Sequence, residues 1–144
     1  MENIFDNRED AARAAADRIG EALQRRLEAQ GDASVVVSGG TSPAGVFAEL
    51  ASKALAWSDV HIILSDERWV PADHEDSNER LVRDTLLSGQ AQEASLLPMY
   101  KAGVTIEDRC GELNDELRLA PFPFACALLG MGEDGHFASL FPDD

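Results

Sequence analysis

The amino-acid sequence predicts an α/β fold with a mainly parallel sheet. Segments in which apolar residues recur every three or four positions alternate with short apolar runs, which is typical of helices that connect parallel strands. The middle of the run at 34–38 is all valine, as expected for a strand buried on both faces. Unusual loops follow three runs, after Val37, Leu64 and Leu129, and parallel sheets bind ligands at the carboxyl ends of their strands.

Length and charge limit the classes of function. At 144 residues the chain can bury a sizeable core, so we expect residues 1–144 to form a single domain. No apolar run is long enough to cross a membrane, and the acidic N-terminus does not resemble a signal peptide. The net charge of −15 disfavours nucleic acid and anionic membranes as partners. An anionic substrate must therefore be held by local features of its site.

The two cysteines, Cys110 and Cys126, do not form a CxxC motif, and Cys126 lies in an apolar run. We therefore expect reduced thiols and a cytoplasmic location.

Each predicted element follows from a local pattern. The segment at 8–29 has an apolar face with helical spacing, and Gly31 is expected to end that helix. A second helix is expected from Pro43 to about residue 55, with Ser42 as its N-cap. The remaining predicted elements are a strand at 59–65, a helix at 78–87 capped by Ser77, a strand at 96–100, a helix at 105–119 capped by Thr105, and a strand at 124–129.

The first loop, at 38–43, is a candidate anion site. Gly39, Gly40, Thr41 and Ser42 offer backbone N–H groups and hydroxyls at the start of a helix, and this combination suits a phosphate. The loop has neither the lysine of a Walker A motif nor a GxGxxG pattern. The alternative is a tight turn that only caps the helix.

The second loop, at 66–76, is a candidate binding segment. Arg68 can hold a phosphate or carboxylate with two parallel hydrogen bonds, and Asp66 can accept from sugar hydroxyls or orient Arg68. The alternative is a solvated charged turn, although Trp69 favours a loop packed against the protein. Asn78, at the start of the next helix, can reach the same place, or it can belong to a solvated helix end.

The other two histidines are not expected to act in catalysis. His74 lies among consecutive acids that cannot all face one metal ion, so no metal site is predicted there. His61 lies on a predicted strand and is expected to be a core or rim residue.

The third loop combines an acid and a histidine with several glycines. His136 is the candidate general base, and Asp134 is the candidate group that fixes its tautomer. Gly132 and Gly135 flank this pair and allow close approach of a ligand to the backbone. The alternative is a turn histidine without a role. No GxSxG motif indicates a covalent nucleophile.

Three segments together resemble the 6-phosphogluconolactonases of the glucosamine-6-phosphate isomerase/6-phosphogluconolactonase superfamily. These segments are 38–43, 66–71 with Ser77 and Asn78, and 129–142. The resemblance implies a Rossmann-like three-layer sandwich and the hydrolysis of 6-phospho-D-glucono-1,5-lactone to 6-phospho-D-gluconate in the pentose phosphate pathway. It implies a phosphosugar lactone as substrate and no metal or cofactor. The loops at 38–43 and 66–68 then hold the phosphate or the sugar hydroxyls, in a division that stays open.

Two alternatives accompany this resemblance. Glucosamine-6-phosphate deaminases share the glycine loop and the Asp-Gly-His turn. They carry an acidic residue in the segment that follows, whereas residues 138–142 of this chain contain none, and they have an aromatic residue in place of Arg68.

The first loop also departs from the usual Ser-Thr-Pro order of the family, with Thr41 and Ser42 before the proline. Members of the family continue past the third motif, so we expect a sheet that is incomplete on its C-terminal side. A non-catalytic sugar-phosphate-binding fragment is the third possibility.

Overall fold

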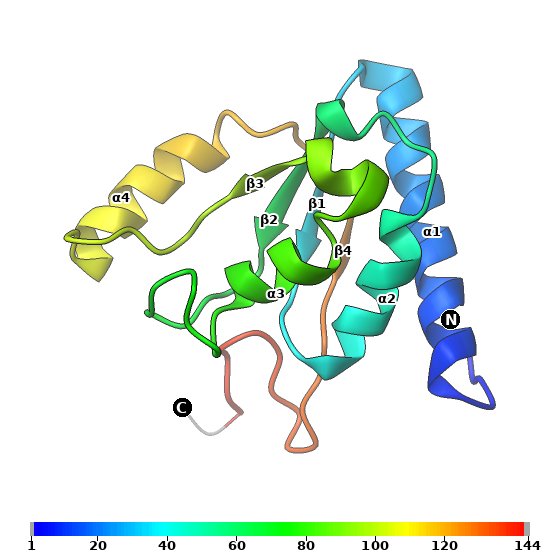
Figure 1. Ribbon diagram of the computed structural model, residues 1–144. Helices are drawn as coiled ribbons and strands as arrows, with labels where there is room; N and C mark the ends of the chain where they lie inside the picture. The colour runs from blue at the N-terminus through cyan, green and yellow to red at the C-terminus, as the bar shows by residue number, and fades with distance from the viewer. Residues whose placement is uncertain (1, 143–144) are drawn as a thin grey trace.

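A four-stranded parallel sheet runs through the computed structural model, which describes residues 2–142 (Figure 1). Its strands are β1 (Ala33–Val37), β2 (Val60–Leu64), β3 (Ser95–Leu97) and β4 (Cys126–Leu128). They lie in the order β3-β2-β1-β4, and each neighbouring pair is parallel. The predicted α/β fold with a parallel sheet is confirmed. Met1, Asp143 and Asp144 of the expected domain lie outside the described residues.

The chain changes direction across the sheet between β1 and β4. The helices are α1 (Arg8–Gln30), α2 (Thr41–Ala51), α3 (Asn78–Thr85) and α4 (Ile106–Leu117), with short 3-10 turns η1 (Trp57–Asp59) and η2 (Gly89–Glu93). Through α2 and α3 the chain steps from β1 to β2 to β3, and through α4 it returns to the other side of β1 (Figure 1). The helices α1 and α2 pack against each other, and α2 also packs against α3. Ligands of such sheets bind where the strand order reverses.

The core lies between β1, β2 and the helices α1 and α2. Val35 and Val37 of β1 have no exposed surface, and neither has Ile62 of β2. They pack in one cluster with fully buried large side chains of the surrounding elements, which include Leu23, Phe47, Leu50, Leu64 and Leu86. The two central strands are therefore more deeply buried than β4, whose residues are half-buried or exposed.

Local capping signals placed most helix ends correctly. Gly31 follows α1 with a φ of 85°, a left-handed conformation that suits glycine. Ser77 and Thr105 accept hydrogen bonds from the backbone N–H groups of Arg80 and Asp108 at 3.2 and 3.1 Å, so both predicted N-caps are confirmed. Within the described residues, no helix combines the length and the apolar character that a membrane span requires.

Several predicted boundaries were wrong. The N-cap of α2 is Gly40 and not Ser42, because the positive φ of Gly40 (106°) turns the chain into the helix two residues earlier. That helix ends at Ala51 rather than near residue 55, and the buried Trp57 then bonds to the carbonyl of Lys53 at 2.9 Å. The predicted strand at 96–100 stops at Leu97, because Pro98 has no N–H to continue the ladder.

Both cysteines are free. Cys110 is exposed on α4, and Cys126 is half-buried in β4. Burial raises the pKa of the Cys126 thiol above its ordinary value. Because the thiolate is the reactive form, Cys126 is a poor nucleophile at neutral pH.

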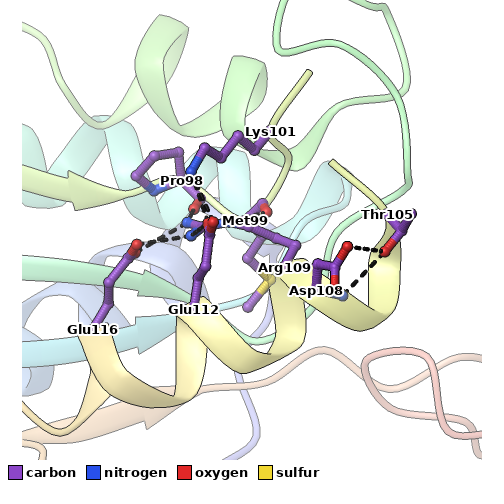
Figure 2. Close-up of polar contacts among 8 residues, drawn as sticks. All are labelled: Pro98, Met99, Lys101, Thr105, Asp108, Arg109, Glu112 and Glu116. Atoms are coloured by element: carbon purple, nitrogen blue, oxygen red, sulfur yellow. Dashed lines mark hydrogen bonds and ion pairs between the residues drawn. The ribbon is translucent and has the colours of Figure 1, made fainter. Parts of the chain in front are cut away.

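A buried arginine joins α4 to the segment after β3, as Figure 2 shows. Arg109 is 3% exposed and donates to the carbonyl oxygens of Pro98 and Met99 at 2.6 and 3.0 Å. It also donates to Glu112 at 3.0 Å and to both oxygens of Glu116 at 2.7 and 3.0 Å. Hydrogen bonding to Arg109 holds the pKa of the Glu116 carboxyl below its ordinary value. The buried charge is thus paired and fully hydrogen-bonded, as a buried charge requires.

Removal of this guanidinium is expected to destabilise the fold. We predict that Arg109→Met lowers the free energy of unfolding by about 2–4 kcal/mol, because two backbone carbonyls and the Glu116 carboxylate lose their Arg109 donor, and among the described residues Glu112 keeps only Lys101. Urea unfolding measures the change. Arg118→Met is the control: Arg118 is exposed and, among the described residues, has Asp115 as its one ion-pair partner, so we expect less than about 0.5 kcal/mol. Equal losses in the two variants would contradict a special role for Arg109.

Candidate functional site

The loops after β1, β2 and β4 meet at a pocket of about 300 Å³. The pocket lies at the carboxyl ends of the strands, where the strand order reverses between β1 and β4. The predicted residues that line it are Gly39, Gly40, Thr41, Ser42, Asp66, Arg68, Asn78, Gly132 and His136. Asp134 and Gly135 are the predicted residues that lie outside the lining. Three loops that are far apart in the sequence thus converge on one hollow.

The first loop places the N-terminus of α2 at the edge of this pocket. The β1–β4 ladder continues into the loop, because Ser38 donates its N–H to the Leu128 carbonyl at 3.1 Å and its hydroxyl accepts from the Gly130 N–H at 3.0 Å. The N-cap Gly40 makes no side-chain capping bond. The first backbone N–H groups of a helix attract anions, and here they border the pocket.

The second loop turns Arg68 toward the pocket without an ion pair. The Asp66 carboxylate accepts from the hydroxyls of Ser65 and Ser139 at 2.9 and 2.7 Å, and it does not pair with Arg68. Arg68 donates Nη1 to the side-chain oxygen of Asn78. Among the ion pairs of the described residues Arg68 has no carboxylate partner, so its positive charge is available to a ligand.

This loop is attached to the protein at Asp66 and Asn78, whereas most of the residues between them are exposed. Asn78 is 2% exposed, and its side-chain Nδ2 donates to the Asp66 carbonyl at 2.9 Å. Trp69 lies edge-on to Tyr100, with ring centroids 5.2 Å apart. Both contacts attach the loop to the rest of the molecule, although the Arg68 side chain itself is exposed.

The third loop pairs His136 with Asp134. The Nδ1 atom of His136 is 2.6 Å from Oδ1 of Asp134, and the backbone N–H of His136 donates to the same oxygen at 3.2 Å. A carboxylate only accepts hydrogen bonds, so Nδ1 carries the proton and Nε2 of the neutral ring is free to act as a base. The His136 ring stacks on Phe141, with centroids 4.8 Å apart. The acid therefore fixes the tautomer, and the phenyl ring supports the orientation.

Position 132 requires a glycine, because the backbone there lies against the His136 ring. A Cβ atom at position 132 would overlap the Cε1 and Nδ1 atoms of His136 and would lie 2.7 Å from Oδ1 of Asp134. The Gly132 N–H donates to the His136 carbonyl at 2.8 Å, and the Gly135 N–H donates to the Gly132 carbonyl at 3.0 Å. Gly135 has a φ of 89°. The loop therefore closes tightly around the pair.

The pKa of the Asp134 carboxyl depends on this contact. The hydrogen bond from the His136 side chain, followed by that from its backbone N–H, holds the pKa of the Asp134 carboxyl below its ordinary value. Both donors favour the charged form, and His136→Ala removes the side-chain donor while keeping the backbone N–H, so the pKa of Asp134 must rise. We predict that the titration midpoint of Asp134, followed by carboxyl NMR, is higher in His136→Ala than in the unaltered chain. An unchanged midpoint would show that the pair does not form in solution.

Sequence reasoning missed one contact that joins two of the loops. Ser139 reaches Asp66 from the C-terminal segment, which Figure 1 shows beside the start of α3. It is presented by a turn in which Phe137 and Leu140 form an isolated bridge and Ala138 has a φ of 50°. A positive φ is unfavourable for alanine and marks a strained turn at this position. No local signal pairs residues 66 and 139.

The other histidines lie apart from this pocket. His61 is half-buried on β2, with its Nδ1 atom 3.0 Å from the hydroxyl of Ser95, in agreement with a rim position. His74 is exposed and bonds to the backbone N–H of Asp76 at 3.2 Å. In the part of the chain that the structure describes, no group of three or more potential ligand side chains is placed to hold a metal ion.

Comparison with known proteins gives one consistent match. A family model described as glucosamine-6-phosphate isomerases/6-phosphogluconolactonase matches residues 6–144. A 6-phosphogluconolactonase of Pseudomonas aeruginosa is 39% identical over 140 residues, which are 97% of this chain and 59% of the relative. A 6-phosphogluconolactonase of Mesorhizobium japonicum is 42% identical over 141 residues, which are 98% of this chain and 59% of that relative.

Solved structures agree with this match. A crystal structure of a 6-phosphogluconolactonase from Shewanella baltica superposes with a TM-score of 0.92 at 43% identity, covering 96% of this chain and 59% of the other. A crystal structure of a 6-phosphogluconolactonase from Thermotoga maritima gives a TM-score of 0.78 at 32% identity. The match covers 95% of this chain and 62% of the other. The chain thus spans about three fifths of the length of the relatives it matches.

Proposed function

This chain belongs to the glucosamine-6-phosphate isomerase/6-phosphogluconolactonase family, and from that membership we propose that it carries the catalytic loop of a lactonase. The proposed reaction is the hydrolysis of 6-phospho-D-glucono-1,5-lactone to 6-phospho-D-gluconate in the pentose phosphate pathway. The observation that carries the proposal is the 2.6 Å contact between His136 and Asp134 at the edge of a pocket that Arg68 also lines. The free thiols of Cys110 and Cys126 support the proposed cytoplasmic location.

In the proposed mechanism His136 activates a water molecule. Its free Nε2 accepts a proton from the water as the oxygen attacks the lactone carbonyl carbon. The C=O bond becomes a C–O⁻ bond in the tetrahedral intermediate. When the intermediate collapses, the bond from that carbon to the ring oxygen breaks, and the imidazolium returns the proton to the ring oxygen. Asp134 stabilises the imidazolium between the two transfers. No metal ion or cofactor takes part in this proposal.

The remaining pocket residues have binding roles in this proposal. Backbone N–H groups of the glycine loops stabilise the oxyanion, which needs donors that are oriented before the reaction. Arg68, Asp66 and Asn78, together with the first turn of α2, bind the phosphate and the sugar hydroxyls. Local positive groups are necessary because the whole chain has a net charge of −15 and repels anions at long range. Arg68 is the one Lys or Arg among the described lining residues.

A coupled assay tests the proposal. Freshly prepared lactone is added to the chain, and 6-phosphogluconate dehydrogenase reports the product after the spontaneous hydrolysis rate is subtracted. A rate above this background that grows with protein concentration is expected. Ammonia release from glucosamine 6-phosphate would instead support the deaminase. Calorimetric binding of 6-phospho-D-gluconate without turnover of the lactone would support a binding fragment.

A further inference from the structure

The carboxylate of Glu67 fills the N-terminus of α3. Its Oε1 accepts hydrogen bonds from the backbone N–H groups of Asn78 and Arg68 at 2.7 and 2.9 Å. Its Oε2 accepts from the N–H of Glu79 at 2.8 Å and from the hydroxyl of Ser77 at 3.1 Å. The first N–H groups of a helix have no partner within the helix and favour a nearby negative charge. This helix end is therefore satisfied by a side chain of the loop that carries Arg68.

The contacts of Glu67 extend to the pocket through Asn78. Glu67 holds the backbone of Asn78, whose side-chain Nδ2 donates to the Asp66 carbonyl at 2.9 Å and whose Oδ1 accepts from Nη1 of Arg68. The same amide occupies the space that a Cβ atom at Gly39 would need, so it also touches the first loop. The position of the Arg68 guanidinium thus depends on the start of α3.

Among the ion pairs of the described residues, Glu67 does not pair with the Arg68 guanidinium, although it bonds to the Arg68 backbone N–H. A glutamate next to an arginine in sequence can pair with it and neutralise it. Here the helix N-terminus takes up the negative charge of Glu67, and the two serine hydroxyls bind Asp66. Arg68 keeps its positive charge for a ligand. Within the described residues Glu67 is not part of the pocket lining, so it is not placed to touch a substrate.

We propose that Glu67 is a positioning residue, which holds the Arg68 guanidinium at the pocket through the α3 N-terminus and Asn78. This inference rests on the proposed lactonase function for its kinetic consequence. Its structural consequence is independent of that function: loss of the Glu67 carboxylate loosens the backbone at the start of α3.

The variant Glu67→Gln tests the inference, because the amide keeps the size of the side chain but turns one acceptor oxygen into a donor. Each carboxylate oxygen receives two donors, so the amide must face two of them with an NH₂ group. We expect KM for the phosphorylated lactone to rise about tenfold and kcat to change by less than about threefold, as for a lost contact that binds substrate and transition state equally. The His136 loop is not touched by Glu67.

Thr105→Ala is the matched control. Thr105 also accepts from a backbone N–H at a helix N-terminus, that of Asp108 at 3.1 Å, but as the N-cap residue of α4 and outside the pocket lining. A general loss of helix stability therefore appears in both variants, whereas the rise in KM is expected in Glu67→Gln alone. An equal KM in the two variants would overturn the inference.

Native-state hydrogen exchange separates this inference from the proposed function. In Glu67→Gln the amides of Asn78 and Glu79 are expected to exchange faster than in the unaltered chain, whereas in Thr105→Ala they keep their protection. Unchanged exchange at both amides in Glu67→Gln overturns the inference even if the lactone is hydrolysed. If the unaltered chain does not hydrolyse the lactone, the proposed function fails, and the exchange result still decides the role of Glu67. Glu67→Asp, which keeps the charge on a shorter side chain, replaces Glu67→Gln if that variant does not fold.

Discussion

Replacement of His136 by alanine is expected to lower kcat for the phosphorylated lactone by about 10²–10⁴-fold, the usual contribution of a general base. The pair with Asp134 makes Nε2 the free nitrogen of the ring, and in the proposed mechanism only this atom takes the proton from water. Substrate binding should change little, because Arg68 and the α2 N-terminus lie on other loops. The coupled assay, run over a range of lactone concentrations, measures kcat and KM separately.

His74→Ala is the control for this variant. His74 is exposed and lies outside the described pocket lining, and among the described residues the polar contacts of its side chain reach only Asp76. The variant His74→Ala also removes one imidazole and should leave kcat unchanged. Equal rates in His136→Ala and the unaltered chain would refute His136 as the base and would leave the family fold untouched.

Replacement of Gly132 by alanine is expected to lower kcat by about 10–100-fold, because displacement of a catalytic group by about 1 Å has effects of this size. The added methyl group would occupy the space of the His136 ring, so the ring must turn away from Asp134 or the loop must open. Backbone strain does not explain the loss, since Gly132 is not among the glycines with positive φ. The effect is therefore a steric one on the general base.

Gly111→Ala is the matched control, because a Cβ atom at position 111 of α4 meets no other atom within 4 Å. Alanine is also the better helix former, so this variant should be as stable as the unaltered chain or more stable. Thermal unfolding and the coupled assay are measured on both variants. If Gly132→Ala retained the kcat of Gly111→Ala, the close approach between the loop and the ring would not matter for catalysis.

Helix ends and the histidine pair were predictable because they depend on near neighbours. Ser77 and Thr105 each cap a helix with a donor three residues away, and Gly31 ends α1 with a conformation that glycine favours. Asp134 and His136 are two residues apart and meet within one turn. Short-range geometry of this kind is contained in the local sequence.

Other features could not be read locally. Ser42 has the chemistry of an N-cap, but the conformation of Gly40 starts α2 earlier. The start of β3 at Ser95 depends on its pairing with β2, about which propensity and pattern carry no information. Its end after Leu97 had a local signal in Pro98, which the predicted strand at 96–100 passed over.

Local patterns in the sequence predict the alternation of helices and strands, the parallel sheet, the three loops at its carboxyl edge and the His136–Asp134 pair. The contacts between those loops arise only in the folded chain. Ser139 bonds to Asp66 across 73 positions, and the Glu67 carboxylate bonds to the start of α3 rather than to the Arg68 guanidinium. The physical reason is that a cap or a turn is set by residues a few positions apart, whereas contacts between loops require the sheet to form first and bring the ends of its strands to one edge.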